Sequence, residues 1–141
     1  MLNIENDTKL NINHKALESI SSTLTSREID LTICYNPTIQ HYNREYRGKD
    51  TPTDVLSFPI DSHFEHMPLG AIVISADYVT DKAQLFGHRC EDELSLLFIH
   101  GLLHLLGYDH EVDSGEMRAK EEALIKNFNL PNSLIVRTEE D

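Results

Sequence analysis

Residues 100–110, with the sequence HGLLHLLGYDH, constrain the fold of this chain more than any other segment. His100 and His104 are four positions apart, so a helix places their imidazoles one turn apart on the same face. Gly107 can adopt the positive φ angle that ends such a helix, and the turn then brings His110 round as a third ligand. Three neutral imidazoles with one open coordination position are typical of a catalytic zinc site. The segment therefore predicts a metal-binding helix, with zinc as the first candidate and nickel or another divalent ion as the alternative.

The spacing of these histidines matches the zinc-peptidase pattern H-E-x-x-H-x-x-G-x-x-H except at one position, where Gly101 replaces the glutamate that acts as general base. Bound zinc lowers the pKa of its water to near neutrality, so hydrolysis does not require that glutamate. Peptide hydrolysis, however, also needs a proton delivered to the amine leaving group. Gly101 therefore shifts the expected substrate away from peptides. Asp109, next to the third ligand, either orients a ligand, shuttles a proton or stabilises the turn.

Three basic residues, Arg44, Arg47 and Lys49, lie within six positions of one another. Phosphodiester cleavage requires a cation over the charge that develops on the phosphate oxygens, and Arg47 is the candidate for this catalytic role. Arg44 and Lys49 are candidate substrate-binding residues. A net charge of −12 argues against a protein that binds nucleic acid over its whole surface, so we expect any such contact to be local. The alternative is an ordinary solvated helix end, where Arg47 complements the helix dipole.

The composition is that of a single globular domain spanning residues 1–141. Hydrophobic residues make up 40% of the chain and charged residues 26%, which is ordinary for a soluble protein. We expect no contact with a membrane, because no apolar run is long enough to cross a bilayer and the N-terminus lacks the features of a signal peptide. The two cysteines, Cys34 and Cys90, have no paired spacing, which favours a reduced, cytoplasmic location.

Hydrophobic periodicity predicts an α/β (α+β) fold, in which a small, mixed, mostly parallel sheet of about four strands packs with about five helices. The first two strands are expected to be parallel, because a helix crosses between them, and the two strands between residues 55 and 74 antiparallel. Asn36 and Asp113 are expected to cap their helices. The expected strands cover residues 2–5, 29–35, 55–58 and 70–74, and the expected helices cover residues 15–24, 37–47, 76–86, 91–106 and 113–128.

Two segments together resemble the YbeY family of bacterial endoribonucleases: residues 100–110, and residues 46–59 with the sequence YRGKDTPTDVLSFP. The resemblance implies a metallopeptidase-like fold and a zinc-dependent, single-strand-specific endoribonuclease. It further implies maturation of the 3′ end of 16S ribosomal RNA and ribosome quality control, with RNA and the ribosome or its small-subunit proteins as partners.

The resemblance also assigns roles to residues. It implies that His100, His104 and His110 hold the metal and that Arg47 is required for activity. One position departs from the family, which usually has Leu-Gly-Asp where this chain has Ala71 after Leu-Gly. If that acid supports the site, its task is missing or performed elsewhere in this chain.

Two other functions are alternatives to the nuclease. One is a metallopeptidase, against which Gly101 argues. The other is a non-catalytic ribosome assembly factor in which zinc mainly stabilises the fold. For both the nuclease and the assembly factor, the basic surface of the ribosome would supply the affinity that the acidic charge of this chain withholds.

Overall fold

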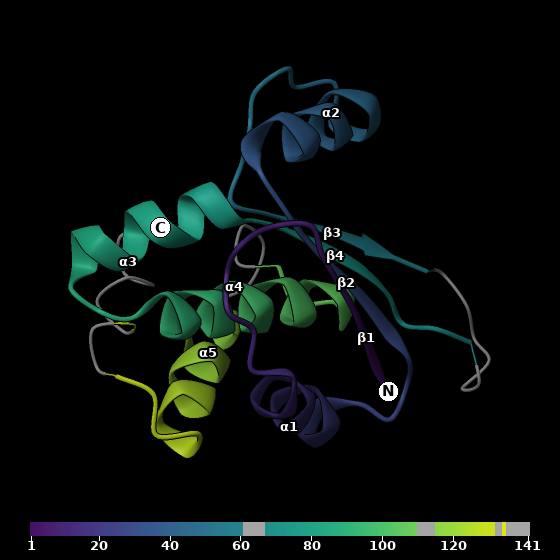
Figure 1. Cartoon of the computed structure of the whole chain (residues 1–141). Helices are drawn as coiled ribbons and strands as arrows, with labels where there is room; N and C mark the ends of the chain where they lie inside the picture. Colours follow the sequence, from purple (N-terminus) through teal and green to yellow (C-terminus); the bar gives the residue numbers. More distant parts are fainter. Residues whose placement is uncertain (61–66, 110–114, 132–133, 135–141) are drawn as a thin grey trace.

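The chain folds as the element order predicts, with a four-stranded sheet and five helices among the residues described (Figure 1). The computed structural model describes residues 1–60, 67–109, 115–131 and 134. The strands are β1 (Leu2–Asn6), β2 (Ile29–Cys34), β3 (Val55–Pro59) and β4 (Gly70–Ser75); the helices are α1 (His14–Leu24), α2 (Asn36–Arg47), α3 (Ala76–Phe86), α4 (Cys90–Leu105) and α5 (Glu116–Asn127). The α/β fold class is therefore confirmed.

The sheet has the strand order β1-β2-β4-β3. Strand β2 pairs in parallel with both β1 and β4, whereas β3 pairs antiparallel with β4, as the sequence predicts. Helix α1 makes the crossover between the two parallel strands β1 and β2. Because β3 is last in the order, it forms an edge of the sheet, and this edge becomes one wall of the cleft described below.

The two faces of the sheet carry different helices. In Figure 1, α2 lies on one side of the sheet, and α1, α4 and α5 lie on the other. Because successive side chains of a strand point to opposite faces, the same strands contact α2 on one face of the sheet and the other helices on the other face. Leu31 of β2 and Ile72 of β4 belong to the large core cluster that also contains the apolar residues of α4, and both are almost fully buried. The smaller cluster toward α2 consists of Cys34, Ile39, Leu56 and Val73, with Tyr42 and Phe58 packed against it.

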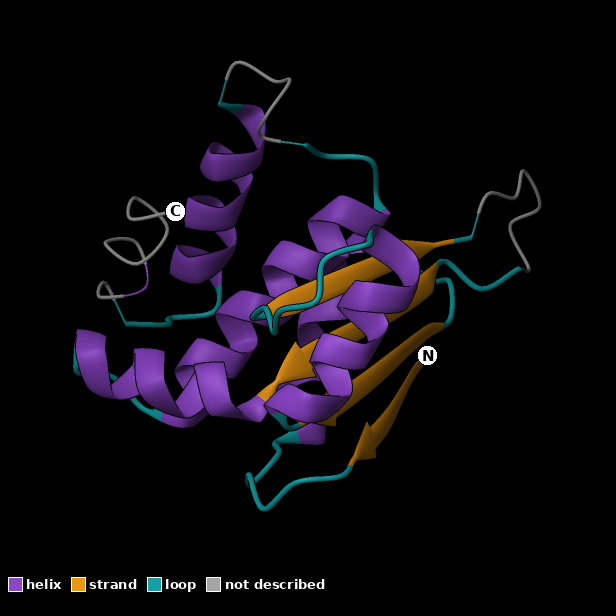
Figure 2. Ribbon diagram, turned by 90° about the horizontal axis from the view of Figure 1, so that it is seen from above, coloured by secondary structure: helices purple, strands orange, loops and turns teal. Residues whose placement is uncertain are grey.

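Helix α4 runs through the centre of the fold because it is apolar on all sides. It packs against β3 and β4 on one side and against α1, α3 and α5 on the others (Figures 1 and 2). At Gly101 the helix approaches the sheet so closely that a Cβ atom would lie 2.9 Å from Cγ2 of Ile72. The hydroxyl of Ser57 on β3 donates a hydrogen bond of 2.9 Å to the carbonyl oxygen of Gly101. The glycine therefore sets the distance between helix and sheet.

Two helix starts differ from the prediction. Asn36 is the first residue of α2 and not its cap, which is Tyr35. The Asn36 side chain instead accepts a hydrogen bond from Ser75, and its backbone N–H donates to the carboxylate of Asp77. Asp113, the cap predicted for the last helix, lies outside the described residues, and α5 starts after Gly115. No described helix has the length and apolar character needed to cross a membrane.

Candidate metal centre and cleft

His100 and His104 lie on one face of α4, as their spacing predicts. Their Nε2 atoms are 3.1 Å apart, and the ring planes are inclined at 77°. Both residues are half-buried, on a helix whose neighbouring positions are almost all buried. Helix α4 ends at Leu105, and Gly107 follows with a φ angle of 99°, as predicted for the residue that turns the chain. The two imidazoles therefore approach each other through their Nε2 atoms.

This convergence fits a shared metal ion. Two nitrogen ligands that are each about 2.0–2.1 Å from a tetrahedral zinc lie about 3.3 Å apart, close to the separation of the two Nε2 atoms. Among the described residues, no third His, Cys, Asp or Glu forms a cluster of three with these imidazoles. His110, the third ligand predicted from the sequence, lies outside the described residues. Its role as a ligand stays a prediction.

A buried carboxylate supports the first histidine. Glu121 on α5 places its Oε1 atom 2.8 Å from Nδ1 of His100, and its side chain is only 6% exposed. An ionised carboxylate is only an acceptor, so Nδ1 carries the proton in this pair and donates to Glu121. The lone pair of Nε2 is then available to bind a metal ion on the other side of the ring. This arrangement is the carboxylate–histidine pair that commonly orients metal ligands in proteins.

His100 and His104 line a cleft of about 700 Å³ that is also lined by residues at the end of α2. Arg47, the last residue of α2, lines the same cleft as His100 and His104 although more than fifty positions separate them in the chain. Arg47 is exposed, and no ion pair joins it to another residue in the described part of the chain. The fold therefore brings the predicted cation and two predicted ligands together. The cleft is lined by Tyr46, Arg47, all residues from Thr53 to Pro59, His100, His104 and Asp109.

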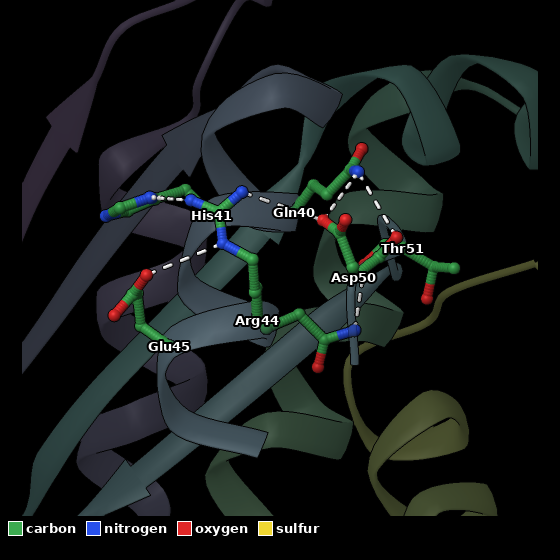
Figure 3. Close-up of polar contacts among 7 residues, drawn as sticks. Gln40, His41, Arg44, Glu45, Asp50 and Thr51 are labelled. Atoms are coloured by element: carbon green, nitrogen blue, oxygen red, sulfur yellow. Dashed lines mark hydrogen bonds and ion pairs between the residues drawn. The ribbon is translucent and has the colours of Figure 1, made fainter. Parts of the chain in front are cut away.

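Arg44 and Lys49, the predicted substrate-binding residues, are not among the residues that line this cleft. Figure 3 shows Arg44 turned toward residues of its own helix and the following loop. Its guanidinium lies 3.0 Å from Nδ1 of His41 and forms ion pairs with Glu45 at 3.5 Å and Asp50 at 3.7 Å. Gln40 also donates to Asp50. The charge of Arg44 is thus partly neutralised, while Arg47 is among the residues that line the cleft.

Three further positions from the sequence analysis can be placed. Asp109 is half-buried and lines the cleft beside the histidine helix. Ala71, which stands where the family usually has aspartate, lies on β4 opposite Phe58 and Asp30, outside the cleft lining. Burial, with the nearby negative charges of Asp7 and Asp77, raises the pKa of the Cys34 thiol to about 11. This thiol is therefore neutral at physiological pH.

Sequence reasoning missed Glu121 and the aromatic residues of the cleft. Glu121 left a signal, because it occupies the apolar face of α5 together with Met117 and Leu124. A carboxylate on a buried face requires a partner. Tyr46 and Phe58 come from different elements, and only the fold shows that they meet across the cleft wall.

Comparisons with known proteins agree with this architecture. The family model described as Endoribonuclease YbeY matches residues 2–129. The Endoribonuclease YbeY of Sulfurovum sp. (strain NBC37-1) is 56% identical over 144 residues, covering 99% of this chain and 98% of the relative. That of Aliarcobacter butzleri (strain RM4018) is 55% identical over 138 residues, covering 97% and 99%. The solution structure of a Thermotoga maritima protein aligns with a TM-score of 0.62 at 28% identity, over 91% of this chain and 89% of that one.

Proposed function

Since this chain belongs to the endoribonuclease YbeY family, we propose that it is a zinc-dependent, single-strand-specific endoribonuclease that matures ribosomal RNA. The family predicted from residues 46–59 and 100–110 is confirmed by these matches. Zinc and ribosomal RNA are the proposed parts, and each has its own support. Zinc is supported by the chemistry of the ligands, and ribosomal RNA by what the family resemblance implies.

The observation that carries the proposal is the shared cleft of Arg47 and the two histidines. A cation that lines the same cleft as two converging imidazoles suits a substrate whose reacting centre gains negative charge on nonbridging oxygens, which is the case for a phosphodiester. Guanidinium binds two such oxygens at once through parallel N–H groups. Because Arg47 has no ion-pair partner among the described residues, its charge is left for the substrate.

In the proposed site, His100, His104 and His110 hold the metal. Bound zinc supplies Lewis acidity and a water nucleophile at neutral pH. Glu121 keeps the proton of His100 on Nδ1, so that Nε2 stays a ligand. Arg47 holds the phosphate and stabilises its developing charge. Asp109, half-buried among the residues that line the cleft, would orient a ligand or shuttle a proton.

The proposed partner is the ribosome or its small-subunit proteins, and the proposed substrate is the 3′ end of 16S ribosomal RNA. The net charge of −12 supports a partner, because a chain this acidic gains little affinity from RNA phosphates alone. Arg44 and Lys49 are proposed as weaker phosphate contacts outside the cleft. Support for Arg44 is reduced by its ion pairs with Glu45 and Asp50.

The test measures cleavage of a labelled single-stranded RNA together with the zinc content of each variant. We expect His104→Ala, or a chelator, to abolish cleavage. Arg47→Ala should lower kcat about 100- to 1,000-fold, as loss of one transition-state donor does in other enzymes, while the zinc content stays at the wild-type value. Arg118→Ala is the matched control, because it removes the same charge from an exposed position on α5. Wild-type rates in the Arg47→Ala variant would contradict the proposed role.

A metallopeptidase is the second candidate, because the cleft wall is an edge strand. Extended peptides commonly add to such edges through main-chain hydrogen bonds. Against it, position 101 has no room for the missing glutamate, since even a Cβ atom would lie 2.9 Å from Ile72 and 3.2 Å from Val55. Turnover of an unstructured peptide by the zinc-loaded protein, lost in His104→Ala prepared in the same way, would favour this candidate over the nuclease.

A further inference from the structure

Tyr46 is exposed at the rim of the cleft, where the proposed function gives it no role. It precedes Arg47 at the end of α2, lines the same cleft, and is 68% exposed. Among the described residues, the other large hydrophobic side chains that are exposed lie outside the residues lining this cleft. These others are Met1, Tyr35, Ile60, Met67 and Leu85. An exposed aromatic ring inside a functional cleft needs an explanation that a scattered surface residue does not.

The ring of Tyr46 is held in place from behind. It stacks on Tyr42, one turn earlier in α2, with ring centroids 6.3 Å apart and planes inclined at 21°. Phe58 of β3 meets it edge to face at 5.2 Å. Tyr42 and Phe58 themselves pack on the buried cluster between α2 and the sheet, defined by Cys34, Ile39, Leu56 and Val73. The core thus supports one side of the Tyr46 ring, and its remaining surface is open to the solvent of the cleft.

We propose that Tyr46 is a stacking platform for one unpaired nucleobase of the RNA whose phosphate is held by Arg47. This inference rests on the proposed function and names the chemical group that the cleft binds besides phosphate. Nucleobases stack on aromatic side chains irrespective of sequence, because every base offers a π face. A ring that is already fixed by its neighbours loses little conformational entropy when a base covers it.

The platform also gives a physical reason for single-strand specificity. A base within a duplex is stacked and paired, so it reaches a protein ring only after it is unstacked. In a single strand the base is free to turn onto Tyr46 while its phosphate stays in reach of the neighbouring Arg47. Recognition through one base face predicts little preference for which base is bound.

The experiment uses the Tyr46→Trp variant, because the chain has no tryptophan and the new indole is its only one. The zinc-loaded variant is titrated with a 2′-O-methylated single-stranded oligonucleotide that is checked to be intact afterwards. A second titration uses an oligonucleotide of the same length and charge that lacks all bases. We expect quenching of indole fluorescence by the first and at least fivefold less by the second. Equal quenching by both would overturn the platform, since phosphate alone would then explain binding.

Unlabelled variants test the wild-type ring. Tyr46→Phe should bind the oligonucleotide as wild type does, whereas Tyr46→Ala and Tyr46→Leu should bind about 5- to 150-fold more weakly, which corresponds to the roughly 1–3 kcal/mol that one stacked base contributes. Leucine keeps the apolar contact with Phe58 but has no π face, so wild-type affinity in Tyr46→Leu would overturn the proposal. Tyr35→Phe, at the opposite end of α2, is the control for changes to an exposed tyrosine.

The outcomes separate this inference from the proposed function. If the wild-type protein cleaves RNA but the abasic oligonucleotide quenches equally, the platform fails and the nuclease stands. If quenching depends on the bases but no RNA is cleaved by the zinc-loaded protein, the platform stands and the nuclease fails. Melting temperatures of all variants, measured in parallel, identify any loss of binding that comes from unfolding.

Discussion

Glu121→Gln is the change that tests most directly how the metal centre is built. The substitution keeps the size of the side chain but replaces an acceptor-only carboxylate by an amide that also donates. The carboxylate lies 2.8 Å from Nδ1 of His100, and because an ionised carboxylate can only accept, it favours the tautomer with the proton on Nδ1. An amide at the same place can donate to Nδ1 instead, which moves the ring proton to Nε2, the atom that faces His104. The ligand then has to lose that proton before it can bind a metal.

The size of the effect follows from the kind of hydrogen bond that is lost. A hydrogen bond to a charged group contributes about 1.5–3 kcal/mol and a neutral one about 0.5–1.5 kcal/mol, so the difference is about 1–1.5 kcal/mol. Because 1.4 kcal/mol corresponds to a factor of ten, Glu121→Gln should weaken zinc binding about tenfold. Glu121→Ala removes the partner altogether at a site that is 6% exposed, and should weaken binding about 10- to 100-fold.

Zinc affinity is measured by competition with a chromophoric chelator at fixed pH and ionic strength. Glu122→Gln is the matched control, because it makes the same chemical change one position along α5, about 100° away around the helix. We expect wild-type affinity in the control and the weakened affinities above at position 121. If Glu121→Gln and Glu121→Ala both bind zinc as tightly as wild type while remaining folded, the carboxylate does not orient His100 and the reasoning is refuted.

Three further predictions concern packing, a thiol and the metal itself. Gly101→Ala should lower the free energy of unfolding by up to about 2 kcal/mol in urea titrations, because crowding against buried Ile72 costs about 1–3 kcal/mol and the gain in helix propensity is about 1 kcal/mol; increased stability would show that the helix can shift. A pKa of about 11 leaves roughly one Cys34 side chain in a thousand as the reactive thiolate at pH 8. Iodoacetamide should therefore label the native wild-type protein as fast as Cys34→Ser. Slower labelling of that variant would contradict this. Zinc at 100 times its Kd should stabilise wild type by about 2.7 kcal/mol and His104→Ala much less, measured by thermal melting; equal shifts would place the metal elsewhere.

Local patterns in the sequence were sufficient for the elements of the fold and insufficient for some of their ends. The alternation in residues 29–35 predicts β2 because strand side chains repeat every two positions, a property of the chain alone. The start of α2 depends on partners from another part of the chain. Asn36 has the side chain of a helix cap, yet Ser75 and Asp77 occupy its hydrogen-bonding groups, so Tyr35 takes the cap position. The sequence near residue 36 gives no indication of a tertiary contact of this kind.

The candidate site also combines features that local sequence patterns predict with features that depend on tertiary contacts. The spacing of His100 and His104 predicts a converging pair because both lie on one helix. That Arg47 shares a cleft with this pair depends on the fold, because residues of the edge strand β3 line the same cleft, and no spacing between residues encodes this. Glu121 was predictable only in part. Its place on an apolar helix face indicates a buried partner, but only the packing of α5 on α4 identifies the partner as His100.

Gly101 connects the packing of the fold with its chemistry. In the sequence it stands where a zinc peptidase has its general base, so it first reads as a missing functional group. In the structure, Ile72, Val55 and the hydroxyl of Ser57 all lie within 3.2 Å of where its Cβ would be. A glutamate here would have to push α4 away from β3 and β4, and α4 carries His100 and His104 into the cleft that β3 lines. Restoring the base would therefore displace the proposed metal ligands, which is why the substitution alone should not create a peptidase.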